Sequence, residues 1–195
     1  MNKNTLITAI LFLTFSGFIY AQNFTVDPAS STVKWVGEKV TGRHDGTVNI
    51  SSGTIIMKDG KLNSGKVEID MTSIKNNDLE DAEYKAKLEG HLKSDDFFGV
   101  ATFPTASLVI TNAVHQGKND YKVMGRLTIK GITKPIKFHA TVDEKDGTLT
   151  GTAEIVIDRS EYNVRYGSGS FFDDLGDKTI YDEFLLKVNI SAKKA

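Results

Sequence analysis

The chain has 195 residues, of which 39% are hydrophobic and 25% are charged, and its formal net charge is −1. This composition is that of an ordinary soluble globular protein, and the near-neutral charge gives no electrostatic attraction for nucleic acid or an anionic membrane. The absence of cysteine excludes disulfide bonds, thiolate metal sites, cysteine nucleophiles and lipid attachment through an N-terminal cysteine.

The first 21 residues are typical of a secretory signal peptide. Lys3 gives a positive start, Leu6–Phe18 is an apolar run, and cleavage is expected near Ala21. The run is shorter than the ~20 apolar residues of a membrane span. We therefore expect residues 22–195 to form one soluble domain, periplasmic or secreted, without stable membrane insertion.

Most of the remaining chain alternates between apolar and polar residues, a pattern that predicts half-buried antiparallel strands. The apolar faces of these strands carry Val33, Trp35 and Gly37; Val67, Ile69 and Met71; Val123, Gly125, Leu127 and Ile129; Ile136, Phe138, Ala140 and Val142; and Phe184, Leu186, Val188 and Ile190. Turns are predicted at Asp59-Gly60, Asn63-Ser64-Gly65, Gly117-Lys118-Asn119-Asp120, Gly131 to Pro135 and Asp146-Gly147.

One segment departs from the alternation. Residues 77–93 place leucines and alanines among charged side chains, which predicts an amphipathic helix of about three turns. Asn77 or Asp78 is the expected N-cap. The helix would lie across the sheet either as a plug or as a lid.

The segment from Leu149 to Arg159 predicts a strand with one apolar and one wet face. Leu149, Gly151, Ala153, Ile155 and Ile157 share the apolar face, which ends in the guanidinium of Arg159. A cation facing an apolar interior costs several kcal/mol (roughly) unless it is paired. Arg159 therefore either forms a buried ion pair or binds the headgroup of an apolar ligand.

Together these elements predict an all-β fold, an antiparallel barrel of about eight strands with one amphipathic helix across it. Long sequential hairpins favour a barrel because closure removes exposed strand edges. A barrel of roughly eight strands is either filled by side chains or holds one ligand.

Motifs for catalysis or metal binding do not emerge. His44, His91, His115 and His139 lack metal-ligand spacing, and the glycine-rich segment 167–170 lacks the lysine and helix pattern of a phosphate loop. We expect no enzymatic activity, no metal and no cofactor. Aromatic residues instead gather near the predicted turns, where they either line a pocket or pack the ends of the barrel: Phe97, Phe98, Phe103, Tyr162, Tyr166, Phe171, Phe172 and Tyr181.

The chain resembles the YceI-like lipid- or polyisoprenoid-binding family over essentially all residues after the predicted signal peptide. The matching motifs are Val33-Lys34-Trp35-Val36-Gly37, Gly42-Arg43-His44-Asp45-Gly46, His91 to Phe98 running on to Phe103-Pro104, Gly125 to Pro135, and Ile157 to Val164.

The resemblance implies an extended, lipocalin-like barrel that holds an isoprenoid-type chain, with export and no cofactor. On this basis we expect a binding protein for transport, storage or stress protection, its partner being an isoprenoid or other long-chain lipid. A filled barrel without ligand and a lipid-modifying enzyme are the alternatives, and the oligomeric state stays open. The candidate ligand-binding residues are Arg159, Trp35, His44, Phe97, Phe98, Phe103, Leu127, Ile155, Tyr162, Phe171 and Phe172.

Overall fold

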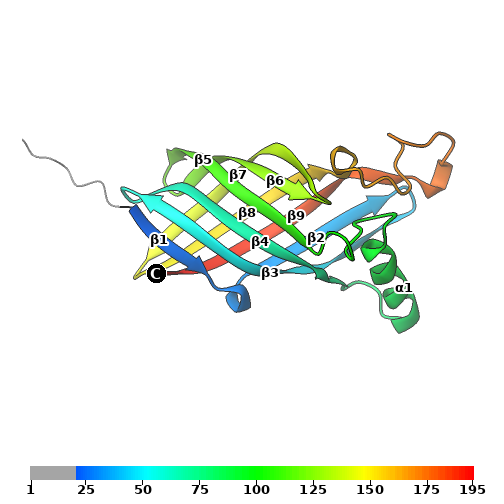
Figure 1. Ribbon diagram of the computed structural model, residues 1–195, viewed down its shortest axis with the longest axis horizontal. Helices are drawn as coiled ribbons and strands as arrows, with labels where there is room; N and C mark the ends of the chain where they lie inside the picture. Colours follow the sequence, from blue (N-terminus) through cyan, green and yellow to red (C-terminus); the bar gives the residue numbers. More distant parts are fainter. Residues whose placement is uncertain (1–20) are drawn as a thin grey trace, which may run out of the picture.

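The computed structural model describes residues 21–195, so the predicted signal peptide lies outside the described residues except for Ala21, which begins the first strand. Nine strands form one sheet (Figure 1). The strands are β1 (Ala21–Val26), β2 (Thr32–Lys39), β3 (Gly42–Lys58), β4 (Lys61–Asn76), β5 (Thr105–Gly117), β6 (Asp120–Ile129), β7 (Ile132–Lys145), β8 (Thr148–Asp158) and β9 (Ile180–Lys194).

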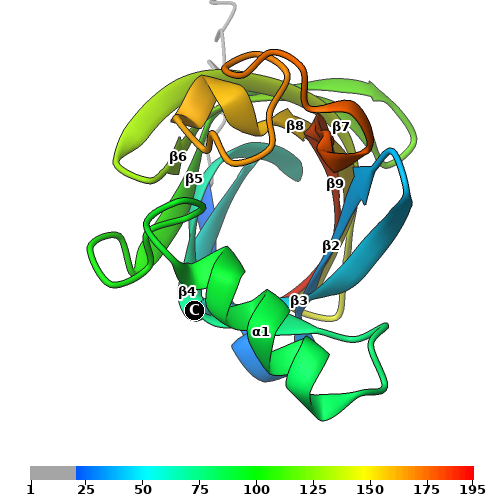
Figure 2. The same ribbon diagram turned by 90° about the vertical axis from the view of Figure 1, so that its right-hand side faces the viewer.

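The sheet closes into an antiparallel barrel, seen end-on in Figure 2. The order is β1-β3-β2-β9-β8-β7-β6-β5-β4, and pairing of β3 with β4 completes the ring. Both β1 and β2 pair with β3 and β9, each with a different stretch of those long strands. Because β1 and β2 share one place in the ring, nine strands occupy eight positions, and the predicted barrel of about eight strands is confirmed.

Two of the predicted hairpin turns have the positive φ angles that favour glycine. At Asp59-Gly60 both φ angles are positive, 52° and 72°, and at Asp146-Gly147 they are 52° and 76°, as tight hairpins require. Two predicted connections are wrong. Asn63-Ser64-Gly65 lies inside β4, where Gly65 pairs with both β3 and β5, and the Gly131 to Pro135 connection is only the turn Lys130-Gly131, since β7 already begins at Ile132.

The two ends of the barrel differ. At one end, which we call the floor, β1 crosses close to the end of β9, and the buried side chains of Phe24, Val26, Tyr121 and Leu149 are packed together with Ala192. At the other end, which we call the mouth, lie the β2–β3 hairpin, the segment that contains the helix, and the long β8–β9 connection (Figure 2). The core thus fills the floor and leaves the mouth to be covered by irregular segments.

The helix α1 (Ala82–Lys93) lies at the rim of the mouth beside β4 (Figure 2); its 12 residues form the predicted three turns, but it begins later in the segment 77–93 than expected. The predicted caps Asn77 and Asp78 are wrong, because Asp81 caps the helix by accepting from the N–H groups of Glu83 and Tyr84. The apolar face is also narrower than expected, since only Leu88 and Leu92 pack against the core. Among residues 21–195, no helix has the length and apolar character that crossing a membrane would require.

The β8–β9 connection begins with the 3-10 turn η2 (Arg159–Tyr162) and contains η3 (Gly176–Lys178) just before β9; a further short turn, η1 (Pro28–Ser30), links β1 to β2.

Candidate functional site

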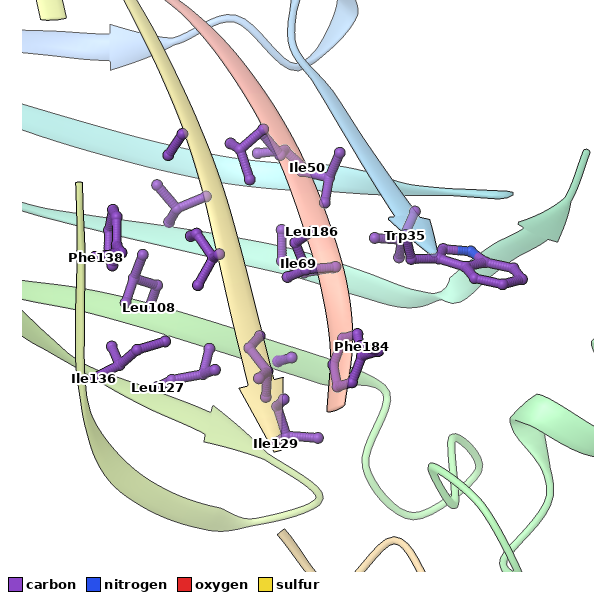
Figure 3. A pocket seen from close by; sticks show the side chains of 18 of the residues that line it. Trp35, Ile50, Ile69, Leu108, Leu127, Ile129, Ile136, Phe138, Phe184 and Leu186 are labelled. Carbon is purple, nitrogen blue, oxygen red and sulfur yellow. The ribbon is translucent and has the colours of Figure 1, made fainter. Parts of the chain in front are cut away.

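A cavity of about 290 Å³ lies inside the barrel, beneath α1. Strands β2 to β9 all contribute to its wall, and Figure 3 shows their apolar side chains pointing into one shared space, among them Ile69, Leu108 and Phe138. The alternation of the strands explains this wall: inward residues are apolar, and outward neighbours such as Thr150, Glu154 and Lys187 are polar. The interior can therefore contact an apolar molecule along the length of the strands.

The cavity runs far along the barrel. On β8 its wall extends from Leu149 near the floor to Arg159 at the mouth. Ten residues of extended strand span roughly 33 Å, and the tilt of barrel strands shortens this along the axis. The space is thus long rather than round, which suits a chain better than a compact molecule.

The polar residues that line the cavity lie mainly at the mouth. They are Glu38, Lys39, His44, His91 and Arg159. Within residues 21–195, no group of three or more histidine and carboxylate side chains is arranged to hold a metal ion. The chemistry available at the mouth is therefore hydrogen bonding and charge, offered beside an apolar space.

Arg159 is buried, with 2% of its surface exposed, although it belongs to the cavity wall. Its guanidinium donates to four backbone carbonyls at 2.9–3.1 Å, those of Val164, Tyr166, Ile180 and Tyr181, and Nη2 lies 3.4 Å from Asp182 Oδ1. Burial acts to lower the pKa of Arg159, which the Asp182 carboxylate opposes. The sequence left two interpretations of Arg159 open, a buried ion pair or a partner for a ligand headgroup. The structure shows the ion pair with Asp182, together with four backbone carbonyls that accept from the guanidinium.

His44 stands at the mouth and belongs to a partly exposed polar network that is built on the buried Asn76. Its Nδ1 lies 2.8 Å from Asp78 Oδ2, while the N–H of Asp45 donates to Asp78 Oδ1 at 2.9 Å. Burial acts to raise the pKa of Asp78, but the hydrogen bonds from Asp45, His44 and Asn76 outweigh it and lower that pKa. Asp78 is therefore ionised at neutral pH and orients the imidazole.

The side chain of Asn76 holds this network in place through hydrogen bonds. It is fully buried; its side-chain amide donates to Asp78 and to the Asp45 carbonyl, and its side-chain oxygen accepts from the N–H of Leu79. Its own N–H donates to Glu89 on α1 at 2.8 Å. The position of His44 is thus coupled to the start of the α1 segment.

Trp35 lies at the mouth end of the apolar wall, and its indole nitrogen is drawn in blue in Figure 3. The ring covers Gly46, where a Cβ atom would meet Cζ2 of the indole at 2.5 Å. The indole Nε1 is buried and has no hydrogen-bond partner among residues 21–195. A donor in this condition is uncommon in folded proteins.

The predicted ligand-binding residues fall into two groups. Seven line the cavity: Arg159, Trp35, His44, Phe97, Phe98, Leu127 and Ile155. The other four do not. Phe103 packs on the Lys130-Gly131 turn, and Tyr162 is buried in η2, where burial raises its pKa to about 12. Phe171 and Phe172 are exposed on the β8–β9 connection, with Arg165 stacked 4.9 Å from the centre of the Phe171 ring.

Sequence reasoning left several wall residues out of the site. Phe184 and Leu186 line the cavity and were already placed on an inward face by alternation, so the signal was available. His91 lines it from α1, with its ring edge-on to Tyr166 at 4.2 Å between centroids. Asp78, which orients His44, carried no signal because it was expected to cap the helix.

Comparisons with known proteins agree with this architecture. A family model described as the YceI-like domain matches residues 24–192. A UPF0312 protein of Shewanella denitrificans is 31% identical over 121 residues, which are 62% of this chain and 61% of that protein. A UPF0312 protein of Pectobacterium atrosepticum is 30% identical over 136 residues, 67% of this chain and 68% of that protein. The chain thus spans roughly three fifths to two thirds of the length of these curated relatives.

Two solved structures share the barrel. The crystal structure of Burkholderia cenocepacia BcnA is 29% identical, with a TM-score of 0.70, and covers 86% of this chain and 99% of that one. A domain from Saccharophagus degradans, described as polyisoprenoid binding and implicated in plant cell wall breakdown, has a TM-score of 0.64 with 88% and 98% coverage. At 14% identity the latter shows a common fold alone.

Proposed function

Because the chain belongs to the YceI-like domain family, we propose that it is an exported binding protein that holds an isoprenoid-type lipid chain in its barrel. The observation that carries the proposal is the long apolar cavity, whose polar wall residues lie mainly at the mouth. The polyisoprenoid-binding description of the Saccharophagus degradans domain, which has the same fold, supports this choice of ligand class.

The size of the cavity sets how such a chain would bind. The volume of about 290 Å³ is near the lower limit of the ~300–1,000 Å³ typical of ligand pockets, so the cavity holds only part of a long chain. A polyprenyl chain of tens of carbons would fill the cavity and continue through the mouth beneath α1. Each buried methylene contributes about 0.8 kcal/mol, so even ten of them give about 8 kcal/mol before the chain's ordering is subtracted.

The proposed role is to carry, store or scavenge the lipid in the periplasm or outside the cell. The signal-peptide pattern of residues 1–21 supports export. The polar outward faces of the strands support a barrel surrounded by water, with the lipid shielded inside.

Organic extraction followed by lipid mass spectrometry tests the proposal. The protein is purified from cells that express the full chain, alongside two variants of β8. Ala153→Phe places a ring inside the cavity, and Val156→Phe is the matched control because Val156 faces outward and is 58% exposed. We expect a stoichiometric isoprenoid-type lipid in the wild type and in V156F, and its depletion in A153F.

A filled barrel without ligand is the second candidate, favoured by the volume, which is near the lower limit of the ~300–1,000 Å³ typical of ligand pockets. Against it, the three atoms nearest to a Cβ on Gly151 would lie 3.8–3.9 Å away and all belong to the neighbouring strands β7 and β9. If neither the wild type nor V156F yields a lipid after exposure to lipid extract, the filled barrel replaces the carrier.

A further inference from the structure

The exposed aromatic side chains of the barrel gather at one end. Within residues 21–195, every exposed aromatic side chain belongs to α1, to the β8–β9 connection or to the start of β9. Figure 1 shows α1 and this connection together at the same end of the long axis. Single exposed apolar residues need no explanation, but a group of them marks an interaction site. The group consists of Tyr84, Tyr166, Phe171, Phe172 and Tyr181, which are 39–64% exposed.

Contacts join these aromatic residues into a surface that borders the cavity. The N–H of Ile180 donates to the Gly167 carbonyl at 2.8 Å, so Tyr181 and Tyr166 lie on adjoining segments of the chain. The Tyr166 ring in turn meets His91 of α1 edge-on, with 4.2 Å between the ring centroids. Tyr181 and His91 both line the cavity, so the aromatic surface lies beside its opening at the mouth.

The two phenylalanines of this surface are held outward by an ordered turn. The N–H groups of Phe171 and Phe172 both donate to the Ser168 carbonyl at 3.1 Å. Ser168 is fully buried, and its Oγ accepts from the N–H of Ser170 at 3.1 Å. Arg165 lies 4.9 Å from the centre of the Phe171 ring. The turn therefore presents two adjacent phenylalanines to solvent, although neither of them packs against the core.

Three features favour a lipid bilayer as the partner of this surface. The surface borders the opening of a cavity whose proposed ligand has an apolar chain, which does not dissolve in water and therefore has to come from a membrane. Tyrosine is enriched where membranes meet water. Residues 165–183 carry two basic and five acidic side chains, a balance that repels an anionic surface and favours a bilayer with neutral headgroups.

A second copy of this chain fits the surface less well. Two barrels that paired through their mouths would bring two acidic connections together and would cover the opening of both cavities. A bilayer covers the same opening with the solvent from which the ligand comes.

We propose that the aromatic surface at the mouth docks the protein reversibly on a bilayer with neutral headgroups, so that the ligand passes between membrane and cavity without crossing water. Phe171 and Phe172 enter the interfacial region of the bilayer, and the polar outer faces of the strands stay in water. This inference rests on the proposed function and names the surface from which the same site takes its ligand.

Two measurements on purified, delipidated protein test the docking: sedimentation with phosphatidylcholine vesicles, and extraction of a long-chain polyprenol from the same vesicles. For the extraction, the vesicles are removed by centrifugation and the polyprenol in the supernatant is quantified over time by mass spectrometry. We expect the wild type to bind the vesicles and to extract polyprenol at a rate that rises with vesicle concentration. Phosphatidylglycerol vesicles should bind more weakly at low salt, because the acidic connection repels them.

A pair of substitutions separates docking from ligand binding. Phe171→Ser with Phe172→Ser removes both rings without changing the cavity wall, to which neither residue belongs. We expect vesicle affinity and extraction rate each to fall about tenfold, because two half-exposed rings no longer leave water on docking. Affinity for an apolar dye in solution should stay within about twofold. Val109→Ser with Val114→Ser removes exposed apolar side chains from β5 instead and should behave like the wild type.

The outcomes distinguish the docking surface from the cavity. If the wild type does not bind phosphatidylcholine vesicles, or if F171S/F172S extracts polyprenol as fast as the wild type, the docking surface is overturned while the lipid-binding function stands. Tighter binding to phosphatidylglycerol than to phosphatidylcholine overturns the choice of a neutral bilayer. A dimer that F171S/F172S dissociates, without vesicle binding, assigns the surface to a second copy. If the wild type binds neither the dye nor the polyprenol, the proposed function itself fails.

Discussion

Arg159 joins three separate parts of the mouth through its guanidinium. Its carbonyl partners are Val164 and Tyr166 after η2, and Ile180 and Tyr181 at the start of β9. A guanidinium has five N–H donors in a planar fork, and four of them are used on these carbonyls. The Phe97 ring, 5.4 Å away, covers the cation from the α1 side. Within the cavity wall, Arg159 therefore acts first as a clamp on the β8–β9 connection.

Replacing Arg159 by methionine should lower the free energy of unfolding by about 3–5 kcal/mol, because it leaves the buried Oδ1 atom of Asp182 without its cation and four backbone carbonyls without their donor. Arg165→Met is the matched control: Arg165 lies on the exposed connection and stacks on Phe171, so its loss should cost about 1 kcal/mol at most. Urea denaturation measures both. Equal stability of the two variants would show that the carbonyl clamp contributes little.

The sequence predicted inward side chains where strands are regular and failed where they are not. Leu127 and Ile155 line the cavity as alternation requires, because a period of two fixes the face of every residue in a strand. Phe171 and Phe172 belong to a connection without periodicity, so their apolar character did not reveal that they face outward. The partners of Arg159 could not be predicted, because they are backbone carbonyls that any residue could provide.

The boundaries of α1 show how tertiary contacts choose among local signals. Asn77, Asp78 and Asp81 are all suitable N-cap residues. Asp78 is engaged by His44 and Asp45, and the N–H of Asn77 donates to the Asp45 carbonyl, so the chain is still bound to β3 at these positions. Asp81 is the first candidate free to cap, and the helix begins after it.

Removing the cap should loosen α1 without unfolding the barrel. Asp81→Ala deletes two hydrogen bonds to the first turn, a loss worth about 1 kcal/mol of helix stability. Since only Leu88 and Leu92 pack on the core, we expect faster amide exchange across residues 82–93 and unchanged protection in β8. Glu80→Ala, next to the cap and exposed, serves as the control. Equal loss of protection in α1 and β8 would contradict an independently opening helix.

At the scale of the whole molecule, the barrel closes through strands that are distant in sequence. β9 pairs with β1, β2 and β8, and the alternation in β1 and β2 could not show that they share one place in the ring. This sharing of one place depends on η1, which links β1 to β2, and on β3, whose 17 residues extend past both strands. Local patterns therefore predicted the class of fold but not its closure.

The closure brings residues 22 and 195 together, since the N–H of Ala195 donates to the Asn23 carbonyl at 2.9 Å. A short linker should therefore join them, with new ends opened between Lys118 and Asn119 in the exposed β5–β6 turn. We expect this permutant to fold and to bind apolar probes like the wild type, because the floor tolerates new ends and the mouth is untouched. Circular dichroism and dye binding measure both properties.

The control permutant opens the chain between Lys130 and Gly131 at the mouth. Lys130 Nζ donates to the carbonyls of Asp95 and Phe97 at 2.8 Å each, which ties the segment after α1 to the β6–β7 turn. New ends here release that turn, so we expect lower stability and weaker probe binding than in the floor permutant. If the two permutants bind probes equally well, the mouth segments do not retain the ligand, and retention resides in the apolar wall alone.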